Sequence, residues 1–190
     1  MRSVAVFCGS NLGALDVYAR EASALGTALA RRSLTLLFGG SDKGLMGVVA
    51  DAALAAGGSV TGIITQRLAE RGDAHPRLES IEVVPDMSAR KRTMALRADA
   101  FVILPGGIGT FEELFEVWAQ SQIEGHGKPI GLLNIGGFFA PLLRCIDHMV
   151  EQRFLPAAHR DMLIVATSPD TLLERFESLI DPSRYQRGCR

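Results

Sequence analysis

Residues 104–116 read Leu-Pro-Gly-Gly-Ile-Gly-Thr-Phe-Glu-Glu-Leu-Phe-Glu and follow directly on the apolar run 100–103. This order predicts a buried strand, a glycine-rich turn and then a helix. Pro105 has no N–H group to donate and therefore ends the strand. The glycines of the turn allow the main chain to approach a ligand closely. Free N–H groups at the start of a helix, beside such glycines, form a site for an anion such as phosphate.

We expect the anion to lie against the turn and the helix start, which are formed by Gly106, Gly107, Ile108, Gly109 and Thr110. Thr110 can cap this helix. A purely structural interpretation fits the spacing equally well, because Thr110 and Glu113 also match a capping box, in which Glu113 folds back onto the main chain. Two common nucleotide motifs are excluded. Glu112 stands where the dinucleotide fingerprint needs its third glycine, and no Lys-Ser or Lys-Thr pair follows a glycine turn as in a Walker A loop.

Strands and helices alternate along the rest of the chain. The apolar runs predict strands at residues 3–7, 33–38, 59–64, 81–84, 100–104, 129–134 and 163–166. Amphipathic or alanine-rich segments predict helices at residues 15–31, 45–56, 87–98, 110–122, 138–152 and 169–180. The polar segment 65–79 is interpreted as a loop or lid beside the site, and residues 181–190 as a polar tail. This alternation predicts one α/β domain over residues 1–180, a doubly wound parallel sheet with helices on both faces.

Two further turns fall on the ligand edge of that sheet. Gly9 and Ser10 follow the first strand, and Gly39 and Gly40 follow the second. In open parallel sheets ligands bind at the carboxyl ends of the strands. We therefore expect these residues to contact the ligand, although simple strand-to-helix turns are the alternative.

The predicted helix 87–98 is basic. Arg90 and Arg97 share a face at a spacing of seven residues, and Lys91 neighbours that face. Such a run is most often a solvated charged surface. The functional alternative is that one of these cations enters the ligand pocket and binds a phosphate or a carboxylate.

Composition narrows the choice of function. A net charge of −1 provides no basic field for nucleic acid, and no apolar run reaches the roughly 20 residues of a membrane span. Three cysteines at wide spacing argue against a disulfide framework and indicate a reducing cytoplasm. The four histidines show no metal-ligand spacing and there is no Cys-x-x-Cys pair, so we expect no structural zinc.

Taken together, these motifs resemble the Lonely Guy (LOG) family of cytokinin riboside 5′-monophosphate phosphoribohydrolases, which are often mislabelled as lysine decarboxylases. The family signature Pro-Gly-Gly-x-Gly-Thr-x-x-Glu is matched by Pro105, Gly106, Gly107, Gly109, Thr110 and Glu113. A second mark, Met-x-x-Arg-Lys, is matched by Met87, Arg90 and Lys91. Further likenesses at residues 7–10, 44–47 and 128–134 extend the match over nearly the whole chain.

The resemblance implies a Rossmann-like fold, a homodimer and hydrolysis of the N-glycosidic bond of an adenine-type nucleoside 5′-monophosphate, with no metal or pyridoxal phosphate. It implies that Arg90 and Glu113 are the catalytic pair. Glu113 would stabilise positive charge on the sugar or activate water. Arg90 would orient Glu113, or bind the phosphate or the leaving base. Among the substrate-binding residues, Arg97 is a weaker candidate for the same anion.

The chain departs from many bacterial members at three places, which bear on substrate preference more than on reaction type. Ser41 stands where a third glycine is common, Asp73 stands where a Glu often precedes Ala-His, and residues 118–122 differ after the catalytic helix start. Two alternatives therefore remain. One is a non-catalytic carrier of a nucleotide-like ligand, similar to molybdenum-cofactor carriers. The other is an AMP nucleosidase with no cytokinin role.

Overall fold

The computed structural model describes residues 1–125 and 127–180. The predicted tail, residues 181–190, lies outside the described residues. The strands are β1 Ser3–Phe7, β2 Thr35–Phe38, β3 Val60–Thr65, β4 Ser80–Val84, β5 Ala100–Ile103, β6 Ile130–Leu133 and β7 Leu163–Ala166. The helices are α1 Asp16–Arg31, α2 Gly44–Ala55, α3 Gln66–Glu70, α4 Met87–Arg97, α5 Ile108–Glu124, α6 Ala140–Glu151, α7 Ala157–Arg160 and α8 Pro169–Ile180, with the 3₁₀ turn η1 Ile135–Gly137.

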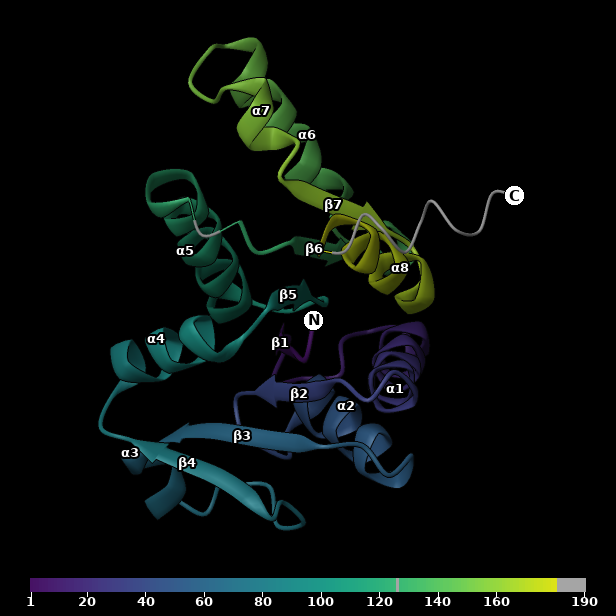
Figure 1. The fold of residues 1–190 in the computed structure, drawn as a ribbon, viewed down its shortest axis with the longest axis vertical. Helices are drawn as coiled ribbons and strands as arrows, with labels where there is room; N and C mark the ends of the chain where they lie inside the picture. The colour runs from purple at the N-terminus through teal and green to yellow at the C-terminus, as the bar shows by residue number, and fades with distance from the viewer. Residues whose placement is uncertain (126, 181–190) are drawn as a thin grey trace.

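All seven strands form one parallel sheet in the order β4-β3-β2-β1-β5-β6-β7 (Figure 1). The chain therefore runs outward from β1 to β4, returns to the centre at β5 and runs outward again on the other side. The strand order reverses between β1 and β5, which pair from Val4 with Ala100 to Phe7 with Ile103. Ligands of doubly wound folds bind beside this point of reversal. The predicted single α/β domain is confirmed.

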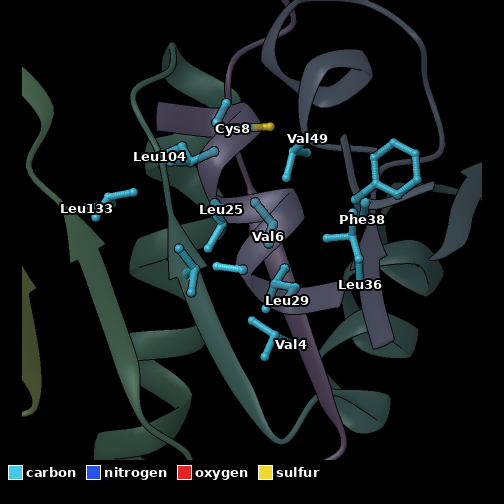
Figure 2. Packing of buried hydrophobic residues seen from close by; sticks show 14 of the residues in the cluster. Val4, Val6, Cys8, Leu25, Leu29, Leu36, Phe38, Val49, Leu104 and Leu133 are labelled. Carbon is cyan, nitrogen blue, oxygen red and sulfur yellow. The ribbon is translucent and has the colours of Figure 1, made fainter. Parts of the chain in front are cut away.

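Alternating side chains of the strands fill two cores, one on each face of the sheet. Val4 and Val6 point to the face covered by α1, α2 and α8 (Figure 2). Ala5 and Phe7 point to the face covered by α4, α5 and α6. The predicted layer of helices on each face is thus confirmed, and Figure 1 shows the two layers on either side of the sheet.

One local prediction was partly wrong. Segment 65–79, interpreted as a loop or lid, contains the short helix α3, in which the Thr65 hydroxyl accepts a hydrogen bond from the Leu68 N–H. In its second half Asp73 and His75 are buried, whereas most of the other residues are exposed. In the described ranges 1–125 and 127–180, no helix has both the length and the hydrophobicity needed to cross a membrane.

Candidate active site

A cavity of about 390 Å³ opens at the carboxyl ends of β1 and β5, where the strand order reverses. Its volume falls in the range of small-molecule sites. Eleven of the predicted site residues line it: Gly9, Ser10, Gly39, Met87, Arg90, Gly106, Gly107, Ile108, Gly109, Thr110 and Glu113. The structure thus brings the turns after three different strands around one space.

Main-chain hydrogen bonds join these turns. The Gly9 N–H donates to the Pro105 carbonyl at 3.0 Å, and the Leu45 N–H donates to the Gly9 carbonyl at 3.0 Å. The turn after β1 is therefore held between the turn after β5 and the start of α2. Because these bonds are between backbone groups, no side chain is needed to make them.

The start of α5 differs from the prediction. Gly107, in extended conformation, is the N-cap and makes no side-chain capping bond, so the helix begins at Ile108. Thr110 is therefore in the first turn and is not the cap, and the capping-box alternative for Glu113 is also wrong. A Cβ on Gly106 would lie 2.2 Å from the Thr110 hydroxyl oxygen, so the glycine is needed for this close approach. The first N–H groups of α5 have no partner within the helix, and Ile108, Gly109 and Thr110 of this first turn line the cavity.

Arg90 is buried in the wall of the cavity, with 8% of its surface exposed. Its Nε donates to the Ile63 carbonyl of β3 at 3.0 Å, and its Nη1 lies 3.5 Å from the Met87 sulfur. A Cβ on Gly39 would lie 1.9 Å from Nη2. The guanidinium is thus fixed by α4, β3 and the turn after β2, and within residues 1–125 and 127–180 the side chain that supports its Nη1 is the weakly accepting thioether of Met87.

Glu113 lies in the second turn of α5 and lines the same cavity. Burial is the main cause that raises the pKa of this carboxyl group, to about 7, although the positive charge of Arg90 acts in the opposite direction. The negative charges of Glu112 and Glu116 raise it, and Lys91 lowers it. A carboxylate with a pKa near neutral pH, next to an arginine in a cleft, is a typical general base.

Lys91 binds two carboxylates of α5. Its Nζ pairs with Glu112 and, at 2.7 Å, with Glu116. These contacts raise the pKa of Lys91, with the hydrogen bond to Glu112 the largest cause. The lysine therefore joins α4 to α5 just beside Glu113 and offsets the two negative charges that flank it.

Comparison with known proteins places the chain in a family. A sequence model described as "Possible lysine decarboxylase" matches residues 46–176. A rice protein (Oryza sativa subsp. japonica), the probable cytokinin riboside 5′-monophosphate phosphoribohydrolase LOGL2, is 42% identical over 93% of this chain and 72% of its own length. The Arabidopsis thaliana cytokinin riboside 5′-monophosphate phosphoribohydrolase LOG1 is 38% identical over 94% of this chain and 84% of its own length. The chain belongs to the LOG family.

Solved structures agree on the fold. The molybdenum cofactor binding protein of Rippkaea orientalis superposes with a TM-score of 0.72 at 22% identity, over 95% of this chain and 98% of its own. The molybdenum cofactor carrier protein of Chlamydomonas reinhardtii gives 0.71 at 19% identity, over 94% and 98%. At such identity the likeness shows the architecture that the LOG family shares with these carriers.

Three predicted substrate-binding residues lie away from the cavity of this LOG-family chain. Gly40 is one residue beyond the lining residue Gly39, and its carbonyl accepts from the His75 N–H. Lys91 points to α5. Arg97 pairs with Glu82 of the edge strand β4, at the far end of α4. The structure thus separates Arg90 from Arg97, although both lie on the same helix.

The cavity of this LOG-family chain also has an apolar part that no sequence motif indicated. Leu12, Tyr18, Met46 and Phe138 also line it. The rings of Tyr18 and Phe138 meet edge to face, with centroids 5.9 Å apart. Phe138 follows a glycine pair after the carboxyl end of β6, so its place on the ligand edge of the sheet could have predicted a cavity residue. Tyr18 comes from α1, and no sequence pattern predicts that it lines the cavity. Cys8 lines the same cavity as a thiol whose pKa is raised by burial.

Proposed function

We propose that the protein hydrolyses the N-glycosidic bond of adenine-type nucleoside 5′-monophosphates to the free base and ribose 5-phosphate. The observation that carries this proposal is the meeting of Arg90 and Glu113 in one cavity, with a glycine-rich helix start in the same wall. The names of relatives at 42% and 38% identity, which are cytokinin riboside 5′-monophosphate phosphoribohydrolases, support the same reaction.

Glycosidic cleavage develops positive charge on the sugar ring. The Glu113 carboxylate can stabilise that charge and remove a proton from the attacking water. Its raised pKa suits the second role, since a carboxylate that titrates near pH 7 is a stronger base than an ordinary one. The water oxygen bonds to the sugar carbon as the bond from that carbon to the base nitrogen breaks, and the proton of the water passes to Glu113. Glu113 then returns a proton, directly or through solvent, to the nitrogen of the departing base and is a carboxylate again. Arg90 orients Glu113 or binds the phosphate or the leaving base.

We assign the 5′-phosphate of the substrate to the start of α5. Gly107 and Gly109 have nothing within 4 Å of an added Cβ, so open space faces both glycines. Unpaired N–H groups and the helix dipole favour a dianion there. With the phosphate at α5, the sugar would lie toward Glu113, which is one helical turn further along.

We also infer that the protein acts as a homodimer in the cytoplasm. Leu96 on α4 and Ile123 on α5 are 74% and 85% exposed, and Phe115 is half-exposed, so the two helices of the catalytic pair present apolar side chains outward. Cys8 and Cys145 are free thiols, which is consistent with a reducing compartment. Light scattering coupled to size exclusion would measure the dimer.

The direct experiment measures base release by chromatography from AMP and from isopentenyladenosine monophosphate. We expect turnover by the wild-type protein and by Glu174→Gln, an exposed carboxylate on α8, and loss of about 100-fold or more in Glu113→Gln. The ratio of the two rates decides between cytokinin and plain AMP as substrate. Nucleotide binding without release from either substrate would support the carrier alternative instead.

A further inference from the structure

Residues 73–77 lie antiparallel to the glycine loop after β2, which we define as residues 39–43. Ser41 and Ala74 form an isolated antiparallel bridge, and the His75 N–H donates to the Gly40 carbonyl at 2.8 Å. Lys43 of the loop pairs with Asp73. These contacts join the loop to a segment that lies outside the cavity.

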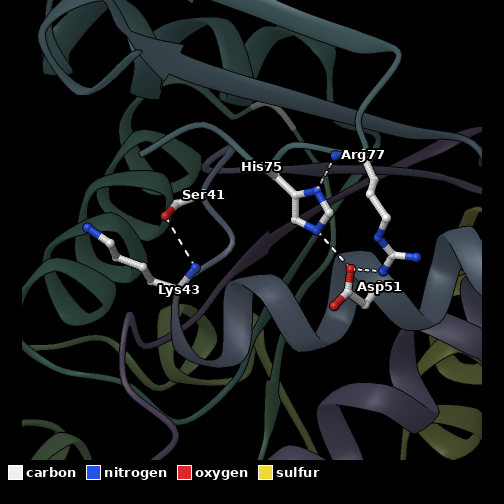
Figure 3. Close-up of polar contacts among 5 residues, drawn as sticks. All are labelled: Ser41, Lys43, Asp51, His75 and Arg77. Carbon is white, nitrogen blue, oxygen red and sulfur yellow. Dashed lines mark hydrogen bonds and ion pairs between the residues drawn. The ribbon is translucent and has the colours of Figure 1, made fainter. Parts of the chain in front are cut away.

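The His75 ring is bound at both nitrogens (Figure 3). The Arg77 N–H donates to Nδ1 at 3.3 Å, so Nδ1 is an acceptor and the proton is on Nε2. Nε2 then donates to the Asp51 carboxylate of α2 at 2.9 Å. Burial acts to raise the pKa of Asp51, but hydrogen bonds from Arg77 and His75 hold it below its ordinary value. The ring, 2% exposed, also packs edge to face against Phe38 of β2.

One residue thus holds both ends of the glycine loop. The main chain of His75 binds the loop at Gly40, and its ring binds the helix into which the loop leads. At one end of the loop, Gly39 touches the Arg90 guanidinium. At the other, Gly44 at the start of α2 is packed so tightly on the Ser10 main chain that a Cβ would lie 2.3 Å from it.

We propose that His75 is a positioning residue for the reaction, which through Gly40 and Asp51 holds the glycine loop 39–43 against Arg90. The inference rests on the proposed function for its catalytic consequence. The His75 side chain lines no described part of the cavity and so acts only through the loop. Because the loop borders Arg90 and the phosphate is assigned to α5, disturbing the loop should slow the chemical step more than it weakens nucleotide binding.

The test compares His75→Ala, His75→Gln and Asp51→Ala with Arg77→Ala, which removes an exposed ion pair to the same Asp51 but keeps the backbone N–H. We expect kcat to fall about tenfold in His75→Ala and Asp51→Ala while KM for AMP changes less than about twofold, since small misplacements of catalytic groups have effects of this size or larger. Glutamine can still donate to Asp51, so His75→Gln should recover most of the activity. The double variant His75→Ala/Asp51→Ala should lose no more activity than either single variant, because both substitutions break the same contact.

Hydrogen exchange provides a readout that needs no turnover. Amides of residues 39–47 should exchange faster in His75→Ala and Asp51→Ala, with wild-type exchange in Arg77→Ala. Unchanged exchange in this segment would overturn the positioning role even if the wild-type enzyme is active. Faster exchange with an unchanged kcat would overturn the catalytic consequence. So would a rise in KM for AMP as large as the fall in kcat. If wild type releases no base, the proposed function fails, and the exchange data alone decide whether His75 holds the loop.

Discussion

Gly39 lies in direct contact with Arg90, and the contact leaves no room for a side chain. A Cβ on Gly39 would come within 1.9 Å of the arginine Nη2 and 3.0 Å of the Met46 sulfur. The glycine of this turn is therefore needed by a neighbouring cation, which is a different reason from the ligand contact that the sequence suggested.

Gly39→Ala should displace the Arg90 guanidinium and lower kcat by about tenfold or more. The physical reason is steric, so the fall in kcat caused by Gly39→Ala should be smaller when the guanidinium is absent. The Arg90→Lys variant is itself expected to be impaired, and adding Gly39→Ala to it should lower kcat little further. Steady-state kinetics of the four proteins in this cycle check the prediction, and equal losses in both backgrounds would contradict it.

Lys91→Met should move the pH dependence of kcat/KM. In the wild-type protein we expect kcat/KM to rise with pH through about 7 as Glu113 loses its proton. Without Lys91, the charges of Glu112 and Glu116 are no longer offset, so the pKa of Glu113 rises and the midpoint shifts to higher pH. Arg92→Met, at an exposed position next to Lys91 on α4, is the matched control and should keep the wild-type profile.

Glu113→Gln should stabilise the protein at alkaline pH. The folded-state pKa is about 7 and the ordinary value 4.5, so between these values the folded state holds a proton that the unfolded chain releases. The contribution of Glu113 to stability is full below pH 4.5 and is lost as pH rises through 7. Glutamine does not ionise and has no such loss. At pH 8 the free energy of unfolding of Glu113→Gln should therefore exceed that of the wild type by up to about 3 kcal/mol. Urea unfolding at pH 5 and pH 8 measures it, and an equal difference at both would be inconsistent with a buried carboxylate.

Two glycines of the same motif should behave differently. In Gly106→Ala the new Cβ would meet the Thr110 hydroxyl and, at 2.8 Å, the Gly9 nitrogen, so we expect a loss of about 1–3 kcal/mol in stability. Gly109→Ala enters open space and should stay within about 0.5 kcal/mol of the wild type. A lower affinity for AMP in Gly109→Ala would place the ligand beside this residue. Thermal unfolding and calorimetric titration separate the two effects.

Alternation of strands and helices, and the edge on which the glycine turns fall, could be predicted because both follow from local periodicity and strand direction. The start of α5 could not, since Thr110 has the residue type of a cap and only the packing of its hydroxyl on Gly106 shows otherwise. Arg90 and Arg97 share a helix face, but about 10 Å of helix separates them. Arg97 therefore pairs with Glu82 of another strand. The role of His75 depends on residues 24 and 35 positions away in sequence, Asp51 and Gly40, which no local pattern could connect.

The Arg90 guanidinium is held by the Ile63 carbonyl, the Met87 sulfur and the close approach of Gly39. The apolar lining of the cavity comes from Leu12, Tyr18 and Phe138, of which Phe138 packs against Phe111 of α5. We therefore expect the proposed chemistry and the choice of base to depend on different cavity residues. Substitutions of Leu12 or Tyr18 should alter which base is accepted more than they displace Arg90 and Glu113. A single ancestral reaction could in this way diversify its substrates by exchanging a few cavity side chains, without rebuilding the machinery that breaks the bond.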